Sequence, residues 1–178
     1  MSTIKIFQKV HGFDCITFNW CMALKHRELI TQFSKLLSKS ADGLSYLVLG
    51  VIFLLINYPN NKYVFIALCV AFIIERSIYF VIKNGFKRNR PGSAIEGFEM
   101  FIKPSDQFSF PSGHTSGAFL FATFIVFLFP EFIWVAYTWA ASIAFSRIFL
   151  GVHFPTDTVA GMVIGTVVGK LVITGLLV

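Results

Sequence analysis

Residues 110–129, FPSGHTSGAFLFATFIVFLF, decide what kind of protein this chain forms. From Gly117 onward the stretch is apolar enough for the hydrocarbon core of a membrane, and Pro130 ends it. Its beginning nevertheless contains Ser112 and His114, and polar side chains are costly in such surroundings unless they are paired or functional. The sequence therefore predicts a membrane helix that begins at a polar site.

The composition of the whole chain is that of a membrane protein. Of its 178 residues, 56% are hydrophobic and 13% are charged, whereas about 25% are charged in an average soluble domain. The formal net charge of +6 comes from basic residues that cluster at the ends of apolar runs, as they do beside membrane spans. We therefore expect membrane lipids and phosphates as partners, and no nucleic acid.

The apolar runs predict an all-α integral membrane helical bundle of about five transmembrane helices. A single domain, residues 1–178, would consist of an amphipathic segment on the membrane surface, 1–40, and a transmembrane core, 42–178. In the first segment, apolar and basic residues are spaced so that a helix has one apolar and one basic face. Asp42 is expected to cap the first membrane helix. The predicted crossings are 42–58, 63–83, 114–129, 132–150 and 156–178.

Two patterns inside these runs predict how the helices pack. Gly161, Gly165 and Gly169 recur every four residues, so they share one helix face and permit close approach of a neighbouring helix. Glu75 and Arg76 interrupt the second apolar run, and we expect them to pair with each other or to face the bundle interior.

Three polar clusters carry the candidate chemistry. Lys83 and Arg90 belong to the stretch KNGFKRNRP, which by itself could be the basic flank of a membrane span. In PSGH, 111–114, the tight turn at Gly113, the Ser112 hydroxyl and free backbone N–H groups can hold an anion or simply cap a helix. The third cluster, SRIFLGVHFPTDTVAG, contains Ser146, Arg147, His153 and Asp157.

The third cluster is the hardest to explain as a membrane flank, since each of its polar side chains would need a partner near lipid. Asp157, four residues after His153, can accept a hydrogen bond from one ring nitrogen and leave the other free to attack or to bind a metal. A metal site formed by these two residues and His114 is the alternative. The lysine and two arginines of the clusters would repel a divalent metal and neutralise a phosphate, which favours a phosphate site without metal.

Taken together, the clusters resemble the three-part signature of the type 2 phosphatidic acid phosphatase superfamily. The signature reads Lys-x6-Arg-Pro, Pro-Ser-Gly-His and Ser-Arg-x5-His-x3-Asp, and each fixed position is present in order and spacing between residues 83 and 157. The flanking apolar runs resemble the helical core of the family's membrane branch, whereas residues 1–40 are not covered. Soluble vanadium haloperoxidases share the signature, but the apolar runs favour the lipid phosphatases, in particular undecaprenyl-diphosphatase-like members.

The resemblance implies a role for each residue of the signature. His153 would be the nucleophile that accepts the phosphoryl group, Asp157 would hold its imidazole in the reactive tautomer, and His114 would protonate the leaving oxygen as general acid. No metal and no other cofactor would be needed. The oxygens of the phosphate would be bound by Lys83, Arg90, Ser112, Gly113 and Arg147.

The resulting hypothesis is an integral-membrane lipid phosphatase that hydrolyses undecaprenyl diphosphate, phosphatidic acid or phosphatidylglycerophosphate through a phosphohistidine intermediate. A phosphotransferase that uses another acceptor and a non-catalytic lipid-binding membrane protein are the alternatives. We expect a bacterial plasma (inner) membrane protein with its site at the membrane surface. The basic residues of 1–40 favour a cytoplasmic N-terminus and, by parity, a cytoplasmic site. Resemblance to bacterial members favours the outer face, which is the expectation adopted. The sequence does not predict an oligomeric state.

Overall fold

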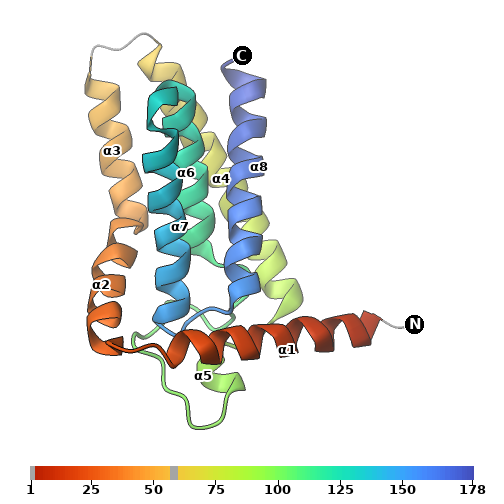
Figure 1. Ribbon diagram of the computed structural model, residues 1–178. Helices are drawn as coiled ribbons and strands as arrows, with labels where there is room; N and C mark the ends of the chain where they lie inside the picture. The colour runs from red at the N-terminus through yellow and green to blue at the C-terminus, as the bar shows by residue number, and fades with distance from the viewer. Residues whose placement is uncertain (1–2, 57–59) are drawn as a thin grey trace.

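The computed structural model describes the backbone of residues 3–56 and 60–178, and every regular element within those ranges is helical (Figure 1). The predicted all-α class is therefore confirmed. The end of the first predicted crossing, residues 57–58, lies outside the described residues. The elements are α1 Thr3–Met22, α2 Arg27–Ser40, α3 Gly43–Leu55, α4 Asn61–Phe86, α5 Pro91–Ala94, α6 Gly113–Leu128, the 3-10 turn η1 Pro130–Phe132, α7 Ile133–Phe149 and α8 Pro155–Leu176.

Helices α3, α4, α6, α7 and α8 run along one common direction, and α1 lies across one end of this bundle (Figure 1). α6 packs against α4, α7 and α8. Within the resulting core, Leu120 and Phe124 of α6 are buried together with Ala71 of α4 and Val168 of α8. Large apolar side chains such as Trp134 also remain exposed on the outside of the bundle, which suits a surface covered by lipid.

The lengths of the helices modify the predicted set of crossings. The stretches Asn61–Ala94, Pro130–Phe149 and Pro155–Leu176 are long and apolar enough to cross a membrane, as predicted for 63–83, 132–150 and 156–178. The 13 residues of α3 extend only about 20 Å. α3 reaches the length of a span only together with α2, from which it is bent by 47°. The 16 residues of α6 are also fewer than a typical span has, because this helix begins at the polar site and ends before Pro130. Within the described ranges, three helices, or four spans if α2 and α3 count as one, are therefore long and apolar enough to cross a membrane, and α6 is a further, shorter apolar helix.

The N-terminal segment is divided into two helices with different placements, whereas the sequence predicted one surface segment over residues 1–40. α1 lies across the end of the bundle (Figure 1). Its side chains Phe13, Ile16 and Trp20 are exposed. His26, whose backbone is left-handed with φ 61°, ends the turn that follows α1. α2 then changes direction and packs along α7.

α2 turns its small polar side chains toward the protein. The side chains that it buries are those of Thr31, Ser34 and Ser38, while Leu29 and Phe33 are exposed. The apolar face seen in the sequence is thus available to lipid, and the small residues let α2 approach α7 closely. This packing brings Ser38 to the polar end of the bundle.

The predicted glycine seam is confirmed. A Cβ atom built on Gly165 would lie 2.0 Å from the carbonyl oxygen of Ser116, and one on Gly161 would lie 2.6 Å from the carbonyl oxygen of Ser112. Both oxygens belong to the beginning of α6 or the residue before it. The two helices are therefore packed backbone against backbone, which holds the polar start of α6 against the start of α8.

Gly165→Ala is expected to destabilise the protein by about 1–3 kcal/mol, because the new methyl group meets backbone atoms that cannot move aside independently. Gly175→Ala in the same helix is the matched control, since nothing lies within 4 Å of its Cβ position. Thermal unfolding of the purified proteins in detergent measures the difference. Equal unfolding midpoints for the two variants would contradict this packing.

Glu75 and Arg76 form the predicted pair. Arg76 donates from Nε and Nη2 to the two carboxylate oxygens of Glu75, at 2.6 and 2.7 Å. The Ser116 hydroxyl also donates to this fully buried carboxylate, and Arg76 Nη2 donates to the carbonyl oxygen of Gly113 at 3.0 Å. The pair therefore connects α4 to the first turn of α6.

Candidate active site

The residues of the three polar clusters meet at one end of the bundle. A cavity of about 550 Å³ lies there, and its lining includes five of the eight predicted site residues: Arg90, Gly113, His114, Arg147 and His153. The other three do not belong to this lining; they are Lys83, Ser112 and Asp157. The elements that supply all eight are the last turn of α4, the residue before α5, the start of α6, the last turn of α7 and the start of α8 with the connection before it. The convergence of these helix ends produces the site.

His153 is buried next to Asp157. The distance from His153 Nδ1 to Asp157 Oδ2 is 3.7 Å, which exceeds that of a hydrogen bond. The other ring nitrogen, Nε2, lies 3.4 Å from Arg90 Nη1. Asp157 itself accepts hydrogen bonds from the backbone N–H of Phe154 and from Arg88, both at 2.8 Å. The carboxylate is thus fixed on one side of the imidazole, and Nε2 is directed toward the arginines.

The environment of His153 favours its neutral form. Burial lowers the pKa of this imidazole well below its usual value, and the charges of Arg90, Arg147 and Lys83 lower the pKa further. A neutral imidazole nitrogen has a lone pair that can attack an electrophile. The same cations that would bind an anion therefore also keep the candidate nucleophile unprotonated.

His114 lies in the first turn of α6, with its side chain paired to Asp42. The distance from His114 Nε2 to Asp42 Oδ1 is 3.1 Å. Asp42 does precede α3 as its N-cap, as predicted, but its side chain makes no capping hydrogen bond. It contacts the histidine instead, so the bend between α2 and α3 delivers a carboxylate to the site.

Two of the three arginines that line the cavity, Arg90 and Arg147, are held in different ways. Arg90 donates from Nη1 to the carbonyl oxygen of Val152 at 2.6 Å and from Nε to that of Asp106 at 3.1 Å. Arg147 donates from Nη1 to the Ser38 hydroxyl of α2 at 2.5 Å. Its Nε is buried without a hydrogen-bond partner within the described part of the chain. Because an unpaired buried donor is costly, Arg147 is suited to bind an anion in the cavity.

Ser112 and Gly113 contribute mainly backbone structure. The Ser112 N–H donates to the carbonyl oxygen of Asp157 at 3.0 Å, and its buried hydroxyl accepts from Thr115 at 2.9 Å. At Gly113 a Cβ atom would lie 2.9 Å from the ring of Tyr79, so a side chain does not fit there. Both residues therefore fix the start of α6 at the edge of the cavity.

A second charged network lies behind Asp157 and connects it to α1. Arg88 donates to Asp157 Oδ1 at 2.8 Å and to Asp14 Oδ2 at 2.6 Å. Asp14 is fully buried and also accepts from the backbone N–H of Thr156 at 3.0 Å. The helix across the end of the bundle is thereby tied to the carboxylate next to His153.

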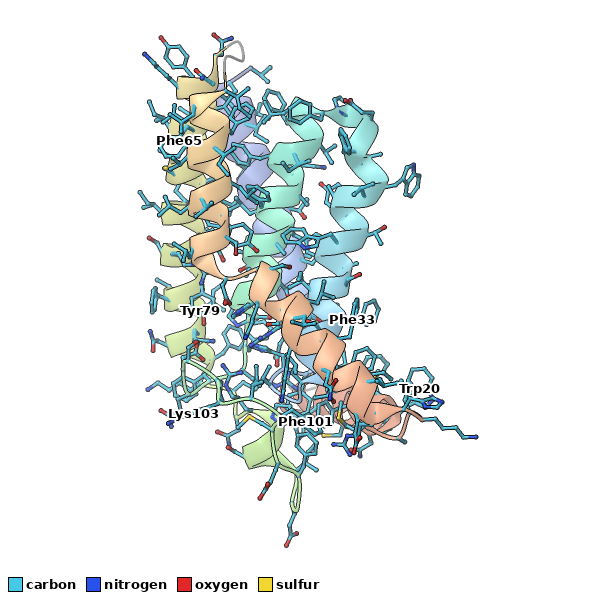
Figure 2. All side chains as sticks on the ribbon, turned by 90° about the vertical axis from the view of Figure 1, so that its left-hand side faces the viewer. Trp20, Phe33, Phe65, Tyr79, Phe101 and Lys103 are labelled. Carbon is cyan, nitrogen blue, oxygen red and sulfur yellow. The ribbon has the colours of Figure 1, made fainter. Side chains whose placement is uncertain are left out.

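The cavity continues from the polar site along α4 into an apolar region. Phe65 and Tyr79, which both line it, lie at clearly different heights in Figure 2. The rise of about 1.5 Å per residue puts them about 21 Å apart along the helix axis. Leu47 of α3 and Ile73 of α4 also line the cavity, yet they are 55% and 67% exposed. The apolar region therefore opens between α3 and α4, on the side of the bundle that faces lipid.

Several site residues were missed by the sequence analysis. Each is a single charged or hydroxyl side chain in an apolar or irregular stretch. None stands at a recurring spacing from another polar residue, so the sequence gives only a weak indication of a role. Arg88 lies within the stretch KNGFKRNRP but at no fixed position of the signature, and the others lie outside the three clusters. Each is recognised only by the group that it contacts in space. These residues are Asp14, Ser38, Asp42, Tyr79, Arg88 and Asp106.

The donor groups of the site do not form a metal centre. Among the described residues, no three or more histidine, cysteine, aspartate or glutamate side chains are grouped so that they could hold a metal ion. His114 and His153, for which the sequence left a metal site as an alternative, contact different carboxylates. The cavity lining contains three arginines and two aspartates, so positive charge is in excess, which suits an anion.

The apolar helical bundle is that of an integral membrane protein, and two histidines and three arginines line the cavity at its polar end. Residues 64–176 match the PAP2 superfamily, and the chain belongs to this family. Relatives in the family have the names of phosphatases, and the protein is accordingly a membrane phosphatase.

The relatives cover most of the chain. Undecaprenyl-diphosphatase of Sulfolobus acidocaldarius is 26% identical over 145 residues, which are 80% of this chain and 70% of that protein. Undecaprenyl-diphosphatase BcrC of Bacillus subtilis is 25% identical over 167 residues, 94% of this chain and 80% of its own length. The crystal structure of Aquifex aeolicus LpxE superposes with a TM-score of 0.80 at 25% identity, over 90% of this chain and 94% of that one. The membrane bundle and the resemblance seen in the signature are thus confirmed.

Proposed function

We propose that this protein hydrolyses the phosphate or diphosphate group of a membrane lipid, with His153 as the nucleophile. The observation that supports the proposal is the continuity of the cavity. Histidines and arginines line one end, and apolar side chains of α3 and α4 line the other, which opens toward lipid. A lipid could place its headgroup at His153 while its hydrocarbon chain stays between α3 and α4.

In the first chemical step, Nε2 of neutral His153 attacks phosphorus, and the bond from phosphorus to the leaving oxygen breaks. His114 in its protonated form donates a proton to that oxygen, and the Asp42 carboxylate 3.1 Å away stabilises the positive charge that this form carries. The products of the step are phosphohistidine and the dephosphorylated lipid. Asp157 stabilises the imidazole from the opposite side.

In the second step, water attacks the phosphohistidine, the bond from phosphorus to nitrogen breaks, and inorganic phosphate leaves. His114, neutral after the first step, takes the proton of the attacking water. The three equatorial oxygens of the transferring group carry negative charge, which Lys83, Arg90 and Arg147 stabilise. Fixed cations would thus stabilise the negative charge that a metal ion stabilises in other phosphatases.

Undecaprenyl diphosphate is the substrate that we favour, since relatives covering 80% and 94% of this chain have the name undecaprenyl-diphosphatase. Phosphatidic acid and phosphatidylglycerophosphate have the same combination of a phosphate and a long chain. We place the protein in a bacterial plasma membrane with its site at the outer face. Labelling of a single cysteine introduced in the connection 95–112 of intact cells tests the orientation, and labelling only after lysis would contradict it.

Release of inorganic phosphate from a panel of purified lipid phosphates, with excess chelator present, tests the function. We expect turnover with at least one long-chain lipid phosphate in the absence of any added acceptor. Activity that disappears with chelator and returns with magnesium or zinc would contradict the role given to the arginines. Turnover only after addition of an acceptor alcohol would instead indicate a phosphotransferase.

Cys69→Trp is expected to raise the KM for a long-chain lipid phosphate by about tenfold, because the larger ring fills the apolar end of the cavity that Cys69 lines. Hydrolysis of water-soluble p-nitrophenyl phosphate should keep its kcat/KM within about twofold, since this substrate needs only the polar end. Ile66→Trp is the matched control, because Ile66 is 56% exposed on the same helix and does not line the cavity. Equal effects on both substrates would mean that the chain does not bind there.

A further inference from the structure

A carboxylate that the sequence analysis did not single out lies between two of the predicted phosphate-binding cations. Asp106 belongs to the connection between α5 and α6. Its Oδ1 accepts from Lys83 Nζ at 2.9 Å and from Arg90 Nη2 at 2.5 Å. Its Oδ2 accepts from the Tyr79 hydroxyl at 2.5 Å, and the same hydroxyl accepts from Lys83 Nζ at 2.6 Å. Both oxygens of this carboxylate are therefore engaged by groups of the site.

Asp106 is an anion in this arrangement. Burial alone would raise the pKa of its carboxyl group, but hydrogen bonds from Tyr79, Lys83 and Arg90 lower this pKa to about 2. The contacts are those that cations make with phosphate oxygens, namely short, charge-assisted hydrogen bonds from an ammonium and a guanidinium. Asp106 also lines the same cavity as His114, Arg147 and His153. A phosphate at His153 and this carboxylate would thus use the same donors.

We propose that Asp106 is an internal competitor of the substrate: its carboxylate holds Lys83 and Arg90, and the phosphate group of the substrate displaces it when it binds. The proposal rests on the proposed function for the identity of the substrate. Displacement exchanges one anion for another on the same two cations, so neither cation is left unpaired. The cost is the loss of the Asp106 contacts, and it reduces the affinity for every anionic ligand.

The surroundings of Asp106 allow this exchange. Its side chain is 34% exposed, whereas those of Lys83 and Arg90 are 5% and 4% exposed. Rotation about the side-chain bonds of Asp106 can therefore carry its carboxylate toward solvent while the cations stay fixed. The backbone carbonyl of Asp106 accepts from Arg90 Nε at 3.1 Å, and this contact can remain. The motion then involves one side chain and no rearrangement of a helix.

The alternative is that Asp106 is a strut that positions the two cations for the substrate. The two roles predict opposite changes in the affinity for phosphate when the Asp106 carboxylate is removed. Removal of a competitor strengthens the binding of phosphate, whereas removal of a strut leaves Lys83 and Arg90 misplaced and weakens it. Direct measurement of anion binding therefore decides between them.

Asp106→Asn and Asp106→Ala are expected to bind orthovanadate and inorganic phosphate about tenfold more tightly or better, with Ala at least as strong as Asn. Titration calorimetry of the purified protein in detergent gives the dissociation constants without turnover, so an inactive protein would overturn the proposed function and leave this measurement intact. Weaker or unchanged binding by both folded variants would overturn the proposal that Asp106 competes with the substrate. If neither variant folds, Tyr79→Phe, which removes one hydrogen bond to Asp106, should still show tighter binding, and weaker or unchanged binding there would overturn it too.

A control variant separates displacement from a general effect of charge. Glu99→Gln removes one negative charge from an exposed position in the connection that contains Asp106. It is expected to change the dissociation constants by less than about threefold, in keeping with a screened interaction. A change as large as that of Asp106→Asn in this control would overturn the proposal.

A structure of the orthovanadate complex provides the second measurement. We expect vanadate oxygens on Lys83 Nζ and Arg90 Nη2, and the Asp106 carboxylate turned away from both nitrogens. Vanadate bound at His153 with Asp106 still on both cations would show that substrate and carboxylate do not compete.

Discussion

His153→Ala is expected to abolish turnover of every phosphate substrate, by about 10⁴-fold or more. Without its imidazole no phosphoenzyme can form, and this holds whatever group departs. The loss should therefore be equal for phosphatidic acid, a prenyl diphosphate and p-nitrophenyl phosphate. Rates of phosphate release from the three substrates give the comparison, and acid-quenched reactions with labelled substrate show whether a phosphoenzyme accumulates.

The control for His153→Ala is a histidine outside the site. His26 is exposed and has a left-handed backbone, which asparagine also tolerates, so His26→Asn removes an imidazole without strain. This variant should retain normal turnover. Substantial activity of a folded His153→Ala protein on any of the three substrates would show that another group attacks phosphorus.

His114→Ala should reduce activity by an amount that depends on the leaving group. The alkoxide of a phosphatidic acid is a poor leaving group and must gain a proton as its bond to phosphorus breaks, so the loss there should be about 10²- to 10⁴-fold. A nitrophenolate needs less help, and so does the prenyl phosphate that departs when a prenyl diphosphate loses its terminal phosphoryl group. The variant should therefore keep a larger fraction of its activity on p-nitrophenyl phosphate and on a prenyl diphosphate than on phosphatidic acid.

The same three substrates also test the assignment of His114 as the general acid. Asp42→Asn should reproduce the dependence on leaving group in weaker form, because Asp42 contacts the acid and not the nucleophile. Equal losses on all three substrates in His114→Ala, together with an active His153→Ala protein, would mean that the two histidines have exchanged roles or that neither performs this chemistry.

The parts of the fold that could be predicted are those set by local pattern. An apolar run of membrane length predicts a helix, and α4, α7 and α8 follow the predicted limits closely. The spacing of Gly161, Gly165 and Gly169 depends only on the helical period, and α6 does pack there. The division of residues 1–40 was not predictable in this way, because amphipathic spacing is the same for a helix on lipid and for one packed on α7.

The residues of the candidate site also fall into those that local sequence pattern predicts and those that it does not. Its eight residues could be named because they stand at fixed spacings within three short stretches, and five of them line one cavity. Their catalytic roles stay predictions until the variants are measured. Asp42 and Asp106 could not be named, since nothing near them in the chain shows that one contacts His114 and the other contacts Lys83 and Arg90.

The sequence by itself determined the class of the protein, a helical membrane phosphatase, because composition and motif spacing are properties of short stretches. Only the tertiary structure decided the charge balance of the site. Coulomb interactions and hydrogen bonds depend on distance in space, and Asp106 is 16 positions from Arg90 along the chain yet 2.5 Å from its guanidinium. Whether Lys83 and Arg90 are free for a phosphate or share a carboxylate is therefore set by the packing of the helix ends and the connection between α5 and α6.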